Sequence, residues 1–253
     1  MNKNHFFISY CGNKRNEFNK IYESIKDKLN DIEYIVEPFC GTSAFSYFLS
    51  LKHPKQFKYI LNDNCKNLID CYEIFQDPDK LNSLIEKLNT FLIDIDKEKY
   101  VKIIKIDDIP NWFLKHKLYN IRPGLYNTNN NKKDYNELVN TPIINFLRTE
   151  NITLSNIDAI ELFNKYQNNN KAFIFLDPPY LQACNSFYNE SNTNIYEYLL
   201  HNNINGLESK IILVLEDNWI IKLLFKDNIK DSYNKRYEKS GKKTNHLLIN
   251  NFI

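Results

Sequence analysis

The sequence predicts an α/β fold with a mostly parallel central sheet, and three short runs of predominantly apolar residues indicate it. Residues 34–36, 57–61 and 173–176 form these runs, and each is bounded by polar residues or by turn formers. A short apolar run of this kind is typical of a strand that is buried on both faces, as in a parallel sheet. Helical patterns separate the runs, which favours parallel strands joined by crossover helices.

The run at residues 173–176 leads directly into Asp177, Pro178, Pro179 and Tyr180. The two prolines end the predicted strand, because neither can donate a ladder hydrogen bond. Asp177 is therefore expected at the carboxyl end of a central strand, where open α/β sheets bind their ligands. The alternative is a strand that simply ends in a turn.

The strand predicted at residues 34–36 runs into a turn that precedes an amphipathic helix. This turn consists of Glu37, Pro38, Phe39, Cys40, Gly41, Thr42 and Ser43. It is similar to the strand–glycine loop–helix opening of nucleotide-binding α/β folds, where small residues let backbone amides approach the ligand. Because Gly41 is its only glycine, the turn departs from G-x-G-x-x-G and favours a ligand without phosphates.

Asp63 and Asn64 follow the strand predicted at residues 57–61. An acid at this place is the one from which α/β folds bind ribose hydroxyls. The alternative role, for either residue, is the N-cap of a helix predicted at residues 68–75. Together with the glycine-containing turn, Asp63 indicates an adenosine-containing ligand.

Residues 76–147 interrupt this alternation with a helical pattern and then a polar, Asn-rich and basic stretch. We interpret residues 1–75 and 148–253 as one domain and residues 76–147 as a small helical insertion with a mobile loop. The alternation then returns, and a hairpin is expected to close the chain. The remaining predicted elements are strands at residues 151–154 and 210–215, helices at 159–166 and 219–225, and hairpin strands at 229–237 and 246–252.

Composition and charge exclude several classes of protein. Of 253 residues, 43% are hydrophobic and 25% charged, which is ordinary for a soluble globular protein. No apolar run is long enough to span a bilayer, and no signal peptide is recognisable, so we expect no membrane association and a cytoplasmic location. The five cysteines are scattered without a C-x-x-C pair, so neither disulfides nor a metal site is expected.

The net charge is only +2, so a nucleic-acid partner would require clustered basic residues. Such clusters occur at Lys14 and Arg15 and again near residues 230–243. The alternative for both clusters is an ordinary solvated surface. Lys14 and Arg15 would begin a helix, where the macrodipole disfavours cations, so an anionic ligand nearby would explain them.

In this order, the motifs resemble those of the Dam-like DNA adenine methyltransferases, the class alpha amino-methyltransferases, including bacteriophage members. Tyr10-Cys11-Gly12-Asn13-Lys14 and Asp177-Pro178-Pro179-Tyr180 carry most of the resemblance, and residues 244–250 look like the family's closing strand. It spans nearly the whole chain and is weakest in residues 76–147. It implies a Rossmann-like methyltransferase fold, with a mostly parallel seven-stranded sheet, an antiparallel C-terminal strand and a small helical target-recognition insertion.

The resemblance also implies S-adenosylmethionine as the cofactor. Tyr10 and Lys14 would then lie by its methionine end, and residues 37–43 would form the loop beneath it. Asp63, with Asn64 beside it, would hold the ribose hydroxyls, and Asp158 the adenine amino group. Ser43 stands where the family usually has a second glycine, which predicts an altered cofactor affinity.

The chemistry of residues 177–180 can be argued from the side chains. The exocyclic amine of adenine is a poor nucleophile, because its lone pair is delocalised into the ring. Asp177 and the carbonyl of Pro178 can each accept one of its N–H groups and aim the lone pair at the methyl group. Tyr180 would stack on the base, which must be flipped out of the duplex. Methylation of RNA adenine or of the exocyclic nitrogen of cytosine, and a catalytically silent nucleic-acid-binding subunit, are the alternatives.

Double-stranded DNA is the partner that this interpretation predicts, with contacts from basic residues of the insertion and of the C-terminal hairpin. The candidates are Arg122, Lys132, Lys133, Lys235, Arg236, Lys242 and Lys243. A homodimer, a cognate restriction endonuclease, and a viral protein acting in a host cytoplasm all remain open.

Overall fold

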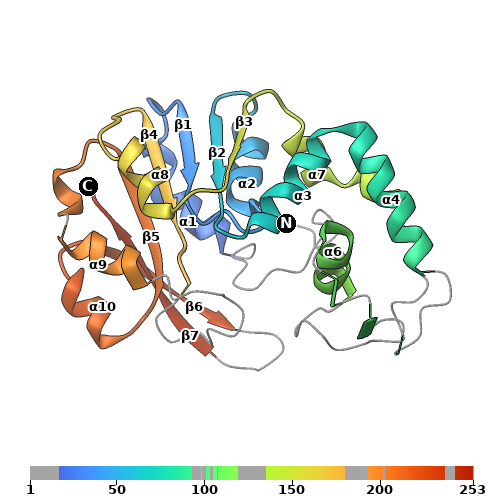
Figure 1. Ribbon diagram of the computed structural model, residues 1–253. Coiled ribbons are helices and arrows are strands. Elements are labelled where there is room, and N and C mark those ends of the chain that lie inside the picture. The colour runs from blue at the N-terminus through green and yellow to red at the C-terminus, as the bar shows by residue number, and fades with distance from the viewer. Residues whose placement is uncertain are drawn as a thin grey trace. The chain divides into compact units, whose positions relative to one another are not determined.

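The computed structural model describes residues 17–92, 98, 101–102, 105–106, 108–118, 135–179, 193–201, 203–236 and 243–252. Its central feature is a seven-stranded sheet in the order β3-β2-β1-β4-β5-β7-β6 (Figure 1). The strands are β1 (Tyr34–Glu37), β2 (Lys58–Asn62), β3 (Ile152–Ser155), β4 (Ala172–Leu176), β5 (Lys210–Glu216), β6 (Ile229–Arg236) and β7 (Lys243–Asn250).

The predicted fold class is confirmed. Strand β1 pairs in parallel with both β2 and β4, and β4 pairs in parallel with β5. Strand β7 then runs antiparallel to β5, and β6 runs antiparallel to β7 at the edge of the sheet. The hairpin strands differ from expectation in one respect, since Lys243, predicted in the connection, begins β7.

The sequence alternates strands with helices as predicted, and most helix boundaries lie within a few residues of expectation. The helices among the described residues include α1 (Phe18–Ile25), α2 (Ala44–Lys52), α3 (Lys66–Gln76), α4 (Pro78–Leu92), α6 (Ile109–Leu118), α7 (Pro142–Leu147), α8 (Ala159–Tyr166), α9 (Thr193–His201) and α10 (Trp219–Leu224). Short 3-10 helices lie at Lys26–Lys28, Asn136–Asn140 and Ile204–Gly206.

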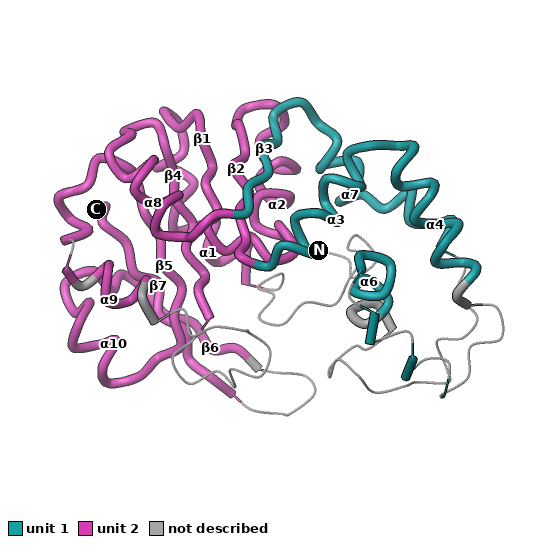
Figure 2. Tube along the Cα trace, viewed as in Figure 1, with its two compact units in different colours: residues 1–13, 65–156 teal, residues 14–64, 157–253 magenta. Residues whose placement is uncertain are grey.

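The chain divides into two compact units, residues 1–13 with 65–156 and residues 14–64 with 157–253 (Figure 2). The predicted insertion, residues 76–147, falls within the first unit. There, Phe75 of α3 packs edge-on against Phe113 of α6, with ring centroids 6.2 Å apart. Arg148 Nε donates to the Phe75 carbonyl at 2.8 Å, which ties the residue after α7 to the end of α3.

In the second unit, β4 is buried on both faces of the sheet, to which successive side chains of a strand point in turn. One face is aromatic: Phe45 of α2 stacks on Phe175 of β4 at 4.0 Å, and Phe18 of α1 packs against Phe45. The opposite face is mainly aliphatic and holds Ile174 of β4 against residues of α8, α9 and α10. Burial on both faces explains why the sequence of β4 is apolar throughout.

Candidate active site

The carboxyl ends of β1 and β4 lie side by side at the centre of the sheet. Strand β2 lies on one side of β1, and β4 lies on the other side. This reversal of strand order is a topological switch point, the place where open α/β sheets bind ligands. Glu37 is the last residue of β1 and Asp177 follows β4 directly, so both carboxyl groups belong to this edge. The predicted position of Asp177 is confirmed.

Glu37 is 2% exposed, and its carboxyl group binds the first turn of α2. Its Oε1 accepts hydrogen bonds from the backbone nitrogen of Ser46, at 2.9 Å, and from the Ser46 hydroxyl. Ser46 is the third residue of α2, whose N-cap residue Ser43 makes no side-chain cap. Glu37 therefore satisfies an amide at the start of α2 that would otherwise lack a partner.

Burial raises the pKa of the Glu37 carboxyl to about 8. The hydrogen bonds from Ser46 oppose this rise, and the negative charge of Asp177 adds to it. The same carboxylate helps to raise the pKa of Tyr59 in β2, although burial is the larger cause there. The edge of the sheet therefore holds a buried carboxyl group, that of Glu37, which binds a proton near neutral pH.

The turn after β1 takes a left-handed backbone at two positions, Gly41 with φ 47° and Ser43 with φ 53°. Glycine adopts such a backbone freely, whereas a residue with a Cβ does so at a cost. Ser43, where the resemblance implies a glycine, thus has a backbone that favours glycine. Within the turn, Phe39 and Gly41 are half-buried while the other members are buried, so these two residues reach the surface.

We expect Ser43→Gly to stabilise the protein. A left-handed backbone costs a residue with a Cβ about 1–2 kcal/mol, and the greater freedom of glycine in the unfolded chain offsets part of this. The free energy of unfolding in denaturant should therefore rise by about 0.5–1 kcal/mol. Ser50→Gly is the matched control: Ser50 lies within α2, where glycine disfavours the helix, so this variant should lose stability. Destabilisation in both variants would contradict the prediction.

Asp63 holds the turn against the end of β2. Its Oδ2 accepts a hydrogen bond from the Gly41 amide at 3.0 Å, and the side chain is 7% exposed. The Cys40 amide donates to the Asn62 carbonyl at 2.8 Å, which adds a second tie. The N-cap residue of α3 is Cys65, so neither Asp63 nor the exposed Asn64 takes the capping role that was the alternative.

Asn62 is a buried polar residue that the sequence analysis missed. Its Nδ2 donates to the carbonyls of Pro38 and Ile157 at 3.0 and 3.1 Å, and its Oδ1 accepts from the Ile157 amide at 3.0 Å. The side chain is fully buried. One amide thus joins the turn after β1, the end of β2 and the segment before α8. A polar residue directly after a buried apolar run was the available signal.

Asp158 begins α8, and its Oδ1 accepts a hydrogen bond from the Ile160 amide at 2.7 Å. This is an ordinary N-cap, which the sequence analysis did not consider for this residue. The side chain is exposed, and Ile157 beside it is held by Asn62. The same Asn62 contact therefore places Asp158 at the edge of the sheet that carries the turn and Asp63.

In the segment after β4, Pro178 is buried, and Asp177 and Pro179 are half-buried. The Tyr196 hydroxyl of α9 donates to the Pro179 carbonyl at 2.8 Å. Nothing in the sequence pointed to Tyr196, because it lies in a separate helix and its role depends on the way that helix packs.

The structure separates the predicted DNA-contacting residues of the C-terminal hairpin. Lys243 is exposed at the start of β7 and pairs in register with Arg236 of β6. Lys235 instead forms an ion pair with Glu17 at 3.3 Å, and the two side chains are 11% and 10% exposed. The Lys235 ammonium is thus largely shielded from solvent and paired with Glu17. We therefore do not retain Lys235 among the proposed DNA contacts.

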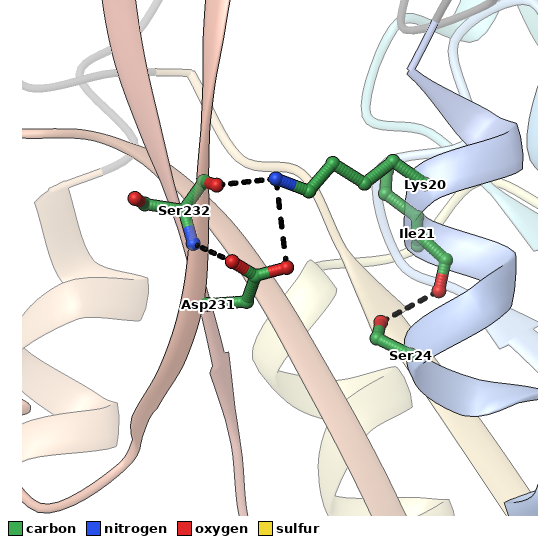
Figure 3. Close-up of polar contacts among 5 residues, drawn as sticks. All are labelled: Lys20, Ile21, Ser24, Asp231 and Ser232. Carbon is green, nitrogen blue, oxygen red and sulfur yellow. Dashed lines mark hydrogen bonds and ion pairs between the residues drawn. The ribbon is translucent and has the colours of Figure 1, made fainter.

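A second tie joins α1 to β6. Lys20 of α1 donates to the Ser232 carbonyl at 2.6 Å and lies 3.6 Å from Asp231 Oδ2 (Figure 3). The other oxygen of Asp231 accepts from the Ser232 amide, which fixes the carboxylate for this contact (Figure 3). Lys20, which lies outside the predicted basic clusters, therefore holds the edge strand β6 to α1.

The remaining predicted site residues lie outside the described residues. They are Tyr10, Lys14, Tyr180, Arg122, Lys132, Lys133 and Lys242. Among the residues that the structure describes, no group of three or more His, Cys, Asp or Glu side chains is arranged to hold a metal ion. No helix in the described part of the chain is long and apolar enough to cross a bilayer.

The sheet order, the glycine-containing turn after β1 and the Asp-Pro-Pro segment after β4 define a Rossmann-like methyltransferase fold. The family model for D12 class N6 adenine-specific DNA methyltransferases matches residues 10–244, and the chain belongs to this family. Adenine methylation of DNA is thus the activity of the class, and DNA its substrate. No curated protein matches the chain.

Proposed function

We propose that the protein transfers a methyl group from S-adenosylmethionine to N6 of adenine in duplex DNA, at a specific sequence, after the base is flipped into the site at residues 177–180. The observation that carries this proposal is the position of Asp177, at the carboxyl end of the central strand and next to the turn after β1. A carboxylate here can meet both a base and a cofactor held by that turn.

The residues at this edge fit an adenosine-containing cofactor. Gly41 has a left-handed backbone and no Cβ, so its peptide can lie close to a ligand. The Asp63 carboxylate at the end of β2 is the kind of group that accepts hydrogen bonds from ribose hydroxyls, and the exposed Asp158 carboxylate can accept one from an adenine amino group. Tyr10 and Lys14 would hold the methionine end. When bound, S-adenosylmethionine supplies an electrophilic methyl group.

The Asp177 segment suits an amine because it presents acceptors. Pro178 and Pro179 have no backbone N–H, so at these two residues the main chain offers only carbonyl oxygens. The Asp177 carboxylate and the Pro178 carbonyl can each accept one N–H of the amine, which draws its lone pair out of conjugation with the ring. Their fixed positions supply orientation and electrostatic stabilisation. Tyr180 would stack on the flipped base.

We place the DNA contacts on Arg122, Lys132 and Lys133 of the insertion and on the C-terminal hairpin. The hairpin contributes Arg236, Lys242 and Lys243, of which Lys243 is exposed. Phosphate contacts from such residues position the duplex and make its binding depend on salt. The insertion is the proposed target-recognition region.

Nucleoside mass analysis tests the reaction. Duplex DNA and RNA are each incubated with the protein and with S-adenosylmethionine labelled in its methyl group, then digested and separated. We expect label in N6-methyl-2′-deoxyadenosine from duplex DNA alone. Label confined to RNA, or found in N4-methyl-2′-deoxycytidine, would support one of the alternative substrates, and no label in any nucleoside would support a silent subunit. Sequencing that detects modified bases would identify the target sequence.

A further inference from the structure

Tyr196 of α9 reaches across to the segment that follows β4. Its hydroxyl donates to the Pro179 carbonyl at 2.8 Å, and the Tyr196 side chain is 6% exposed. The two residues are 17 positions apart in the chain. A buried hydroxyl that finds its acceptor on the backbone of the proposed catalytic segment is either a general packing feature of α9 or a device that fixes this segment.

The backbone of Asp177-Pro178-Pro179 is already restricted at all but one dihedral. Each of Asp177 and Pro178 precedes a proline, and this disfavours the helical region for both of them. The rings of Pro178 and Pro179 fix φ near −65°. The ψ angle of Pro179 is the one that neither ring nor a following proline restricts. That angle turns the Pro179 carbonyl, which is the group that Tyr196 binds.

In the described part of the chain, the Tyr196 hydroxyl is the group that donates to the Pro179 carbonyl. Pro178 and Pro179 have no N–H, so they cannot be anchored by main-chain donors as an ordinary turn would be. An external donor must reach the carbonyl oxygen itself. The helix α9 provides one, and Ile195 and Leu199 on either side of Tyr196 are buried in the aliphatic core that includes Ile174 and Leu176 of β4. Helix and strand are thus held by the same core.

We propose that Tyr196 is a positioning residue of the methyl-transfer reaction, and that its hydroxyl fixes the Pro179 carbonyl so that Asp177 and the Pro178 carbonyl keep their aim at the target amine. This rests on the proposed function. Tyr196 does not touch the reacting atoms itself. Without the hydroxyl, the Pro179 peptide loses its anchor to α9, so the stiff segment can shift as a unit and its acceptors spend less time in the reactive arrangement. The value of kcat then falls while substrate affinity is kept.

The test compares two variants that each remove one hydroxyl from α9. Tyr196→Phe keeps the buried ring and loses only the bond to Pro179. Tyr198→Phe is the matched control, because the Tyr198 hydroxyl donates to Asn164 of α8 and to Gln167 at 3.4 Å, away from the segment after β4. For each variant, kcat and the KM values for target DNA and for S-adenosylmethionine are measured, together with unfolding in denaturant.

We expect Tyr196→Phe to lower kcat roughly fivefold, the rate equivalent of one ordinary hydrogen bond, with both KM values within twofold of the unchanged protein. Tyr198→Phe should leave all three constants within twofold. An equal loss of kcat in both variants would show a general effect on α9 and overturn the proposal. So would an unchanged kcat in Tyr196→Phe, or a change confined to KM. The unchanged protein is assayed first: if it methylates no adenine, the proposed function itself fails.

Discussion

Asp177→Ala should reduce methyl transfer to adenine by roughly 10²–10³-fold, because it removes a preorganised acceptor for the amine. Asp177→Asn keeps the size and one acceptor oxygen of the side chain, so it should lose less. Both variants should fold, since Asp177 is only half-buried. Single-turnover transfer of labelled methyl groups to duplex DNA measures the chemical step directly.

A suitable control for this experiment is Asp217→Ala. Asp217 follows the neighbouring strand β5 as Asp177 follows β4, and it binds Lys222 at 2.9 Å and Asn245 at 2.9 Å. We expect its removal to cost stability but to leave the single-turnover rate within a few-fold. Asp177→Ala with an undiminished rate would refute the role assigned to this carboxylate, whatever the control does.

The free energy of unfolding should fall as the pH rises from 5 to 8, and Glu37 should cause much of this fall. The pKa of its carboxyl is raised from 4.5 to about 8 in the folded protein. Between these values the folded state binds a proton that the unfolded state has released, so each pH unit lowers stability by about 1.4 kcal/mol. Below pH 4.5 both states are protonated, and above pH 8 neither is. The whole effect is on the order of 3–5 kcal/mol.

Glu37→Gln should remove this dependence. Glutamine resembles the protonated carboxyl and keeps an acceptor for Ser46, so the variant should match the unchanged protein near pH 5 and exceed its stability at pH 8. Glu33→Gln is the control, because Glu33 pairs with Lys171 at the surface and both side chains are about half exposed. Denaturant unfolding at several pH values measures the slopes. Equal slopes between pH 5 and 8 for the unchanged protein and Glu37→Gln would contradict the assignment.

Local sequence patterns predicted the strands that carry the site. The run before Asp177 is apolar throughout and two prolines follow Asp177, and these features predict a buried strand and where it ends. The turn at Gly41 was recognisable for a similar reason, since a glycine between a strand and a helix marks a special backbone. Asp63 was expected at the end of its strand, where the structure has it.

The contacts of the site could not be predicted, because they depend on residues far apart in the sequence. Glu37 was assigned to the cofactor loop, and its carboxyl group also caps α2 by accepting from Ser46. The left-handed backbone of Ser43 lies between these two residues, and the sequence did not predict it. Lys235 belongs to a run of charges that resembles a DNA-binding surface. Only the folded structure shows that Lys235 forms an ion pair with Glu17, which directly precedes α1. Pattern alone cannot distinguish an exposed charge from a paired one.

The ties between α1 and β6 have a consequence for biosynthesis. Lys20 and its acceptor Ser232 lie 212 residues apart, so on the ribosome α1 emerges long before the strand that it binds. The nascent helix exposes the buried faces of Phe18 and Ile21 until β4 and then the hairpin are made. Contacts of such long range slow folding and leave the apolar face of this amphipathic helix open to aggregation in the interval. Completion of this unit is therefore expected only after the last strands have been synthesised.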